Sequence, residues 1–88
     1  MSWTYRFDER ALKELKKLDR QVQWEIIAYL DERVAGKASP RRFGKRLKAE
    51  LVGLWRYRVG DYRILCQIRD GELIVLVVAV GHRRDIYA

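Results

Sequence analysis

LWRYRVGDYRILCQIRDGELIVLVVAVGHRRDIY, residues 54–87 of an 88-residue chain, is the stretch that decides the fold. Its apolar residues follow the two-residue period of β-strands. Its turn sequences, Gly60-Asp61 and Asp70-Gly71, are of the kind that close tight antiparallel hairpins. We therefore predict three consecutive strands joined by two-residue loops, followed by a short basic tail.

The first of these loops sets the register of the first hairpin. Arg58 then lies opposite Arg63, and Arg56 lies opposite Leu65. Alternation places Arg56, Arg58 and Arg63 on one face and apolar residues on the other, namely Trp55, Tyr57, Ile64, Cys66 and Ile68. Since directly opposed like charges destabilise a sheet, we expect this arginine face to bind an anion.

The composition indicates a single domain, residues 1–88, with a basic surface. Apolar residues make up 49% of the chain, enough for a core, so disorder is not expected. Lys and Arg number 19 against 12 Asp and Glu, a net charge of +7. This balance suggests a polyanionic partner, and so small a domain has little room for a deep enzyme cleft.

Residue counts exclude several classes of site. Cys66 is the single cysteine and His82 the single histidine, so we expect no intrachain disulfide, no ordinary zinc site and no cofactor. The opening MSWTYRFDER is too charged for a signal peptide, and Leu73–Val80 is too short to cross a bilayer. We predict a soluble cytoplasmic protein without a membrane partner.

The N-terminal part predicts a strand and two helices. Trp3–Phe7 alternates like a strand, and Asp8 is a suitable N-cap for the first helix. The second helix is expected to begin near Asp19 and to end near Gly36. Apolar residues at helical spacing mark the inner faces: Phe7, Ala11, Leu15 and Leu18 in the first helix, and Val22, Ile26, Tyr29, Leu30 and Val34 in the second.

Residues 37–50 lack a clear period and contain the one proline, Pro40. Between Arg41 and Lys48 there are five basic residues and no acidic one: Arg41, Arg42, Lys45, Arg46 and Lys48. The segment is either a solvated loop or a flank that contacts phosphates beside the arginine face. The sequence favours neither.

The last strand, Glu72–Val80, is apolar on both faces, as is typical of a central strand. Alternation places Leu73, Val75, Val77 and Ala79 on one face and Ile74, Leu76, Val78 and Val80 on the other. Two helices suffice for one face, so part of the other is expected to be open to a partner. Trp24 and Ile27, beside the stripe of the second helix, are either peripheral core or a second such surface.

Common catalytic motifs are not present. The sequence has no glycine-rich phosphate loop, no paired histidines and no acidic cluster suited to Mg²⁺. Asp8, Glu9 and Glu14 are interpreted as cap and surface residues. Strand alternation turns Cys66 inward, which disfavours nucleophilic cysteine chemistry.

A basic and aromatic set remains: Arg56, Arg58, Arg63, His82, Arg83, Arg84 and Tyr87. If the tail folds over the arginine face, the set suits metal-free phosphoryl transfer in RNA. Guanidinium groups bind phosphate and offset its developing charge, imidazole exchanges protons near neutral pH, and tyrosine stacks on an unpaired base. Each residue taken singly is better explained structurally, Arg84 by an ion pair with Asp85 and Tyr87 by packing of the chain end.

Three stretches of the sequence resemble the RelE/ParE superfamily of bacterial toxins, and the RelE branch most. They are FDERALKELKKL (Phe7–Leu18), YRVGDYRI (Tyr57–Ile64) and VVAVGHR (Val77–Arg83), followed by the terminal Tyr87. The resemblance covers nearly the whole chain. It implies an α+β fold with two N-terminal helices packed on a small, twisted, mainly antiparallel four-stranded sheet.

The resemblance also implies a function. RelE-type toxins are mRNA interferases that enter the A site of the 70S ribosome, where the ribose 2′-hydroxyl attacks the adjacent phosphate. The implied partners are ribosome, mRNA and a RelB-like antitoxin, with operator DNA bound only through the antitoxin complex. Ile74, Leu76 and Val78, or Trp24 and Ile27, are the candidate antitoxin contacts.

Carried over by position, the resemblance implies the roles of individual residues. Arg56 and Arg58 match the basic pair of the second strand, Arg63 the phosphate-binding arginine of the third, and Arg83 the basic residue after the last strand. Tyr87 matches the tyrosine that orients the substrate. The basic loop (Arg41, Arg42, Lys45, Arg46 and Lys48) and Arg84 are candidate RNA-binding residues.

This sequence departs from the family in three places. Arg56 and Arg58 stand where well-studied members carry lysines, and arginine holds its proton too firmly to be an easy base. Charge stabilisation is therefore their assigned role. Lys45 lies near the position where other branches carry a catalytic glutamate, which leaves His82 as the candidate proton carrier. The chain also ends without the C-terminal helix of some relatives.

Two alternatives stay open at this point. One is a ParE-like inhibitor of DNA gyrase, and the other is a non-catalytic RNA-binding or ribosome-binding module on the same fold. The concentration of Arg, His and Tyr at the hairpin and tail favours the nuclease over the gyrase inhibitor.

Overall fold

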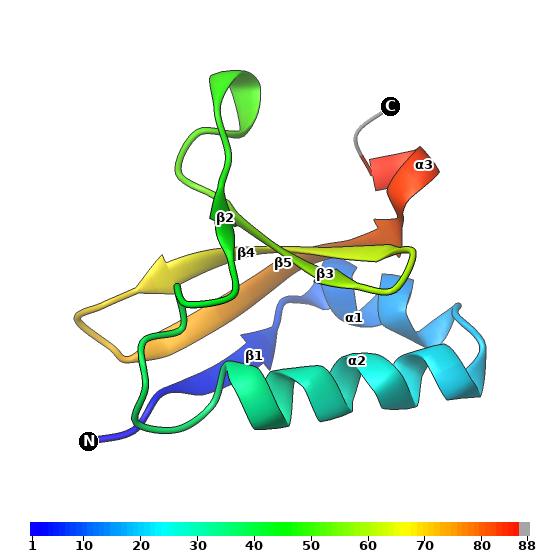
Figure 1. Ribbon diagram of the computed structural model, residues 1–88. Coiled ribbons are helices and arrows are strands. Elements are labelled where there is room, and N and C mark those ends of the chain that lie inside the picture. The colour runs from blue at the N-terminus through cyan, green and yellow to red at the C-terminus, as the bar shows by residue number, and fades with distance from the viewer. Residues whose placement is uncertain (87–88) are drawn as a thin grey trace.

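The structure, a computed structural model, describes residues 1–86. Its elements are β1 (Thr4–Phe7), α1 (Glu9–Lys16), α2 (Arg20–Arg33), β2 (Lys45–Arg46), the 3₁₀ turn η1 (Ala49–Leu51), β3 (Trp55–Val59), β4 (Tyr62–Arg69), β5 (Ile74–His82) and α3 (Arg83–Ile86). The strands form one sheet in the order β1-β5-β4-β3-β2. Figure 1 shows α1 and α2 on one side of this sheet, while the arm formed by β2 and η1 rises on the other side, as does α3.

The α+β class is confirmed, but the sheet has five strands in the described residues and not the predicted four. The additional strand is β2, in which Lys45 pairs with Arg56 and Arg46 with Trp55. A two-residue basic strand carries no apolar alternation, so no local pattern marked it. The basic tail begins with a single helical turn, α3, into which β5 runs directly, and the sequence pattern did not predict this turn.

The first hairpin has the predicted register. Arg58 lies opposite Arg63, and Arg56 lies opposite Leu65. Gly60 adopts φ = 58°, a left-handed conformation that glycine takes at little cost. The two-residue turn therefore sets the pairing of the whole hairpin.

The second predicted turn is wrong. Arg69 pairs with Ile74, so the loop contains four residues, 70–73, and not two. The amide of Leu73, which has φ = 55°, donates to the carbonyl of Asp70. The Arg41 guanidinium donates to both carboxylate oxygens of Asp70, at 2.9 and 2.8 Å, and anchors the loop from outside the hairpin.

A β-bulge in β5 overturns the predicted faces of the last strand. Leu65 pairs with Ala79 but Cys66 pairs with Val77, so Val78 is an extra residue on β5. An extra residue reverses the alternation beyond it. Val80 consequently joins the buried core on the helix side, whereas strict alternation predicted it on the opposite face.

The core lies between the sheet and the two long helices. It consists of Ala11, Leu15, Ile26, Leu30, Val34, Tyr57, Ile64, Cys66, Val75, Val77 and Val80. Asp8 caps α1 as predicted, its Oδ1 accepting from the amide of Ala11 at 2.8 Å. Both helices begin where expected, and Ala11, Leu15, Ile26 and Leu30 pack into the core as their spacing indicated. Phe7 and Leu18 were also assigned to the first helix, but Phe7 ends β1 and Leu18 follows α1.

One core contact ties the basic loop to the sheet and predicts a stability effect. The hydroxyl of fully buried Tyr57 donates to the carbonyl of Pro40. Tyr57→Phe leaves that carbonyl unpaired, so we expect the free energy of unfolding to fall by about 1–2 kcal/mol. Urea denaturation measures it, and an unchanged midpoint with an unchanged slope would show that the hydrogen bond contributes nothing.

Candidate functional site

The arginine face lies on the side of the sheet away from α1 and α2. Arg58 on β3 pairs with Arg63 on β4, and Arg63 pairs in turn with Gly81 on β5. Tyr57 and Ile64, which alternate with these arginines, belong to the core on the helix side. The strand register thus sets Arg58 and Arg63 side by side on this face.

Arg63 is held in place by the turn between β3 and β4. It is 9% exposed, and its Nη1 donates to the carbonyls of Gly60 and Tyr62 at 3.0 Å each. These bonds hold one end of the guanidinium against the backbone. A buried, oriented guanidinium is a preorganised anion-binding group, because its orientation need not be acquired when the anion arrives.

Arg83 reaches the same turn from the end of β5. Its backbone amide donates to the carbonyl of Asp61 at 2.8 Å, and its Nε lies 3.8 Å from the Asp61 Oδ1. Two arginines 20 residues apart in sequence are therefore both anchored on the turn 60–61. Tyr87, predicted to complete the group, lies outside the described residues.

His82 is not brought together with the arginines. It pairs with Tyr62, and the two rings meet edge to face with centroids 5.5 Å apart. The Tyr62 ring packs against the core on the helix side. The His82 Nδ1 accepts a hydrogen bond from the Arg84 amide at 3.1 Å. The bulge in β5 therefore leaves His82 on the opposite side of the sheet from Arg63, contrary to the expectation that the tail carries it over the arginine face.

The basic loop divides into structural and exposed cations. The bidentate pair between Arg41 and Asp70 is structural, and its hydrogen bonds lower the pKa of the Asp70 carboxyl below its usual value. The Arg41 guanidinium also lies 5.3 Å from the centre of the Trp55 ring. The remaining four cations of the loop are exposed: Arg42, Lys45, Arg46 and Lys48. Four of the five cations thus face solvent and one serves the fold, while contact of the exposed four with phosphate stays a prediction.

A basic cleft of about 420 Å³ opens beside β3. It is lined by Tyr29, Arg33, Phe43, Lys45, Arg56 and Arg58. β2 pairs with only two residues of β3, so the cleft lies where the described sheet edge is uncovered. Sequence reasoning missed Tyr29, Arg33 and Phe43. The position of Phe43 within a basic run was a sign that it could contact RNA. No sequence pattern indicated that it would lie beside α2.

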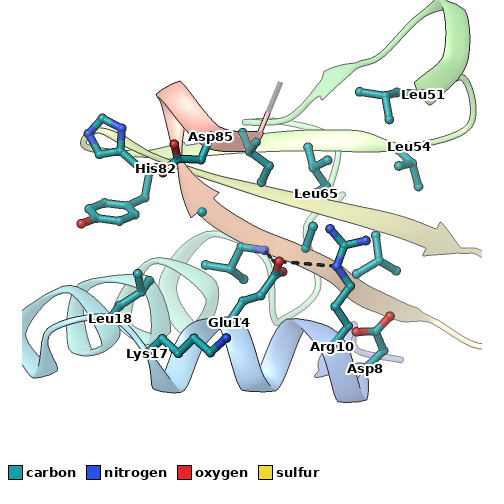
Figure 2. A pocket seen from close by; sticks show the side chains of 16 residues that line it. Asp8, Arg10, Glu14, Lys17, Leu18, Leu51, Leu54, Leu65, His82 and Asp85 are labelled. Carbon is teal, nitrogen blue, oxygen red and sulfur yellow. Dashed lines mark hydrogen bonds and ion pairs between the residues drawn. The ribbon is translucent and has the colours of Figure 1, made fainter. Parts of the chain in front are cut away.

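A larger cleft of about 690 Å³ lies along the free edge of β5, between α1 and α3. β1 pairs with β5 only as far as Val77. Beyond it, the Glu14 Oε1 accepts from the amide of Val80 at 2.9 Å and its Oε2 pairs with Arg10, as Figure 2 shows. Glu14 was interpreted as a surface residue, and the structure corrects this because its carboxylate caps a strand edge. The mixed charge of the lining makes this cleft a poor phosphate site.

Cys66 points into the core, as predicted. It is fully buried, its Sγ donates to the carbonyl of Trp55 at 3.6 Å, and burial raises the pKa of its thiol to about 12. Residues 1–86 hold no group of three or more His, Cys, Asp and Glu side chains placed to bind a metal ion. None of the helices in that range has the length and apolarity needed to span a membrane.

Comparison with known proteins gives matches over nearly the full length. A family model described as the ParE toxin of type II toxin-antitoxin systems matches residues 5–87. Toxin RelG of Mycobacterium tuberculosis is 39% identical over 87 residues, covering 99% of this chain and 98% of that protein. The mRNA interferase toxin RelE of Escherichia coli is 32% identical over 92 residues, covering 100% and 93% respectively.

Solved structures agree with these matches. A chain of the RelBE toxin-antitoxin complex from Mycobacterium tuberculosis superposes with a TM-score of 0.80 at 31% identity. That alignment covers 94% of this chain and 100% of the other. The three helices and the mixed sheet are therefore those of an established toxin fold.

Proposed function

This chain belongs to the RelE/ParE superfamily of toxins from type II toxin-antitoxin systems, and from that premise we propose that it is a ribosome-dependent mRNA endonuclease of the RelE type. The observation that carries the proposal is the convergence of Arg63 and Arg83 on one turn, with Arg58 opposite Arg63. The name of the Escherichia coli relative, an mRNA interferase, supports it. The net charge of +7 suits a ribosomal partner.

In the proposed reaction the ribose 2′-hydroxyl attacks the neighbouring phosphorus and the 5′-oxygen leaves. The products are a 2′,3′-cyclic phosphate and a free 5′-hydroxyl. The guanidinium groups of Arg58, Arg63 and Arg83 bind the non-bridging oxygens and offset the charge that grows on them. These cations supply the positive charge, so we propose chemistry that does not depend on a metal ion.

The sequence suggested His82 as the proton carrier, and this assignment is withdrawn. Because His82 lies on the helix side of the sheet with Tyr62, we do not assign it as the proton carrier. Arginine retains its proton at physiological pH and is not a base. The role of Tyr87 in orienting the base or the 2′-hydroxyl stays a prediction from the family resemblance.

The proposed partners are the 70S ribosome with its mRNA and a RelB-like antitoxin. The relative from Mycobacterium tuberculosis was solved in a toxin-antitoxin complex, which supports the antitoxin. We propose operator DNA as a partner only of that complex. Trp24, with 70% of its surface exposed on α2, is the candidate antitoxin contact that the structure leaves most open.

Mapping mRNA 5′ ends on programmed ribosomes, with and without the purified protein, tests the proposal. New ends confined to the A-site codon, and absent when ribosomes are omitted, support it. Intact mRNA on ribosomes that have bound the protein would point to a non-catalytic binding module. A short expression pulse that breaks DNA without stopping protein synthesis would point to a gyrase inhibitor.

Asp61 is predicted to position Arg83. Its side chain and that of Arg83 are both more than half exposed, and exposed pairs contribute at most about 1 kcal/mol. Asp61→Asn should therefore lower kcat for mRNA cleavage by no more than about fivefold, while the affinity for ribosomes is unchanged. The matched control is Asp19→Asn, which removes an exposed carboxylate that makes no capping hydrogen bond in the described chain. A loss of ribosome affinity without a change in kcat would contradict the positioning role.

A further inference from the structure

The basic cleft beside β3 has the chemistry of a nucleotide-binding site. Arg33, Lys45, Arg56 and Arg58 bring four positive charges to it, and Tyr29 and Phe43 bring two aromatic rings. No acidic side chain is among its described lining residues. A volume of about 420 Å³ falls within the usual range for small-ligand pockets.

The two rings and the guanidinium of Arg33 form a ready stacking surface. The Arg33 guanidinium carbon lies 5.3 Å from the centre of the Tyr29 ring and 5.0 Å from that of the Phe43 ring. Phe43 is 45% exposed, and Arg42 lies 5.2 Å from it. Proteins that bind single-stranded RNA stack unpaired bases on such aromatic and guanidinium planes.

Arg56 supplies a second, independent observation that points to a ligand. Its Nε is buried and has no hydrogen-bond partner within residues 1–86. Buried donors are nearly always paired, and leaving one unpaired costs free energy. Arg56 lines the cleft, so a small turn of its side chain would present this donor to a phosphate oxygen or a base carbonyl bound there.

The position of the cleft connects it to the arginine face. Arg58 lines the cleft and also lies opposite Arg63 on the neighbouring strand. Adjacent strands are about 4.8 Å apart, so a single RNA strand bound at Arg63 can continue across β3 into the cleft.

We propose that this cleft binds one unpaired nucleotide of single-stranded RNA, its base stacked on Phe43 and Arg33 and its phosphate held by Lys45 and Arg58. The inference rests on the proposed function, since it names a further subsite for the same RNA substrate. An acidic peptide would also suit four cations, but it would not use the stacking surface. The aromatic rings therefore favour RNA.

Fluorescence anisotropy with a labelled RNA hexamer tests the site apart from catalysis. The hexamer carries 2′-O-methyl groups throughout, which remove the attacking hydroxyl, and no ribosomes are present. Phe43→Ala should raise the Kd by roughly tenfold, the usual effect of removing a base-stacking ring, and Phe43→Tyr should bind as the wild type. Trp24→Ala removes a more exposed aromatic ring on α2 and should leave the Kd unchanged.

The salt dependence of RNA binding separates the contribution of charge from that of base stacking. Arg33→Gln should weaken binding, and Arg20→Gln, at the other end of the same helix, is its matched control. If Lys45 binds phosphate, Lys45→Gln should lower the slope of log K against log salt by about 0.7, whereas Phe43→Ala should leave the slope unchanged. Thermal unfolding of each variant shows whether it is folded.

Three results would overturn the proposal. The first is wild-type affinity for the hexamer in both Phe43→Ala and Arg33→Gln, and the second is an equal loss of affinity in these variants and in their controls. The third is that the two variants lose binding to a labelled oligoglutamate peptide but not to RNA. The site and the function fail separately. If the protein does not cut mRNA on ribosomes but its hexamer binding depends on Phe43, the cleft assignment holds and the nuclease assignment falls.

Discussion

Replacing Arg63 with alanine should lower kcat for mRNA cleavage on programmed ribosomes by roughly a hundredfold or more. Arg63 is nearly buried, and the carbonyls of Gly60 and Tyr62 orient its guanidinium before any substrate arrives. A preorganised cation stabilises the charge that develops on the phosphate at no cost in reorganisation. Removing it takes away that stabilisation, and water does not replace it with equal effect.

Further variants show whether a loss of activity comes from the missing cation or from misfolding. Arg83→Ala removes a cation whose side chain is 54% exposed and should lose most of the activity without unfolding the chain. Arg63→Lys keeps the charge but not the two bonds to the turn, and we expect intermediate activity. Arg69→Ala, at the exposed far end of the same strand, should cleave as the wild type. Undiminished cleavage by both alanine variants of the site would refute the assignment of the arginine face.

Leu30→Ala is expected to have the largest effect on stability. Leu30 is fully buried between α2 and the sheet. Truncating such a side chain removes its burial and leaves a cavity, which together cost about 2–5 kcal/mol. Small domains have total stabilities of about 5–15 kcal/mol, so this single change should sharply lower the midpoint of urea unfolding, which circular dichroism measures.

The control for this prediction is the same substitution on the neighbouring helix. Leu12 on α1 is 39% exposed, so Leu12→Ala should change the free energy of unfolding by less than about 1 kcal/mol, since much of its side chain already contacts water. If the two variants unfold at the same urea concentration, Leu30 does not have the role in the core that its burial indicates.

Much of the fold and part of the site were predictable because they depend on neighbours in sequence. The turn at Gly60-Asp61 alone sets the register that places Arg58 opposite Arg63. The helical spacing of Ala11 and Leu15, and the cap at Asp8, needed only a few adjacent residues. Such features are decided by the conformational preferences and side-chain directions of a short segment.

The remaining features were decided by contacts between distant segments. The four-residue loop 70–73 is anchored by Arg41, 29 positions away from Asp70. The bulge at Val78 reverses the end of β5 and turns His82 away from Arg63. Phe43 meets Arg33 only because the loop after α2 returns beside that helix.

By itself, then, the sequence determined the strand periods as far as the bulge in β5, the first hairpin, most of the helix faces and the surplus of positive charge. The tertiary structure decided which cations share a surface, because one extra residue in a strand moves every later side chain to the other face. It also decided that β2 pairs with β3 and that Arg33 and Phe43 line one cleft. Local preferences cannot encode these pairings, since they depend on how separate elements pack against a common core.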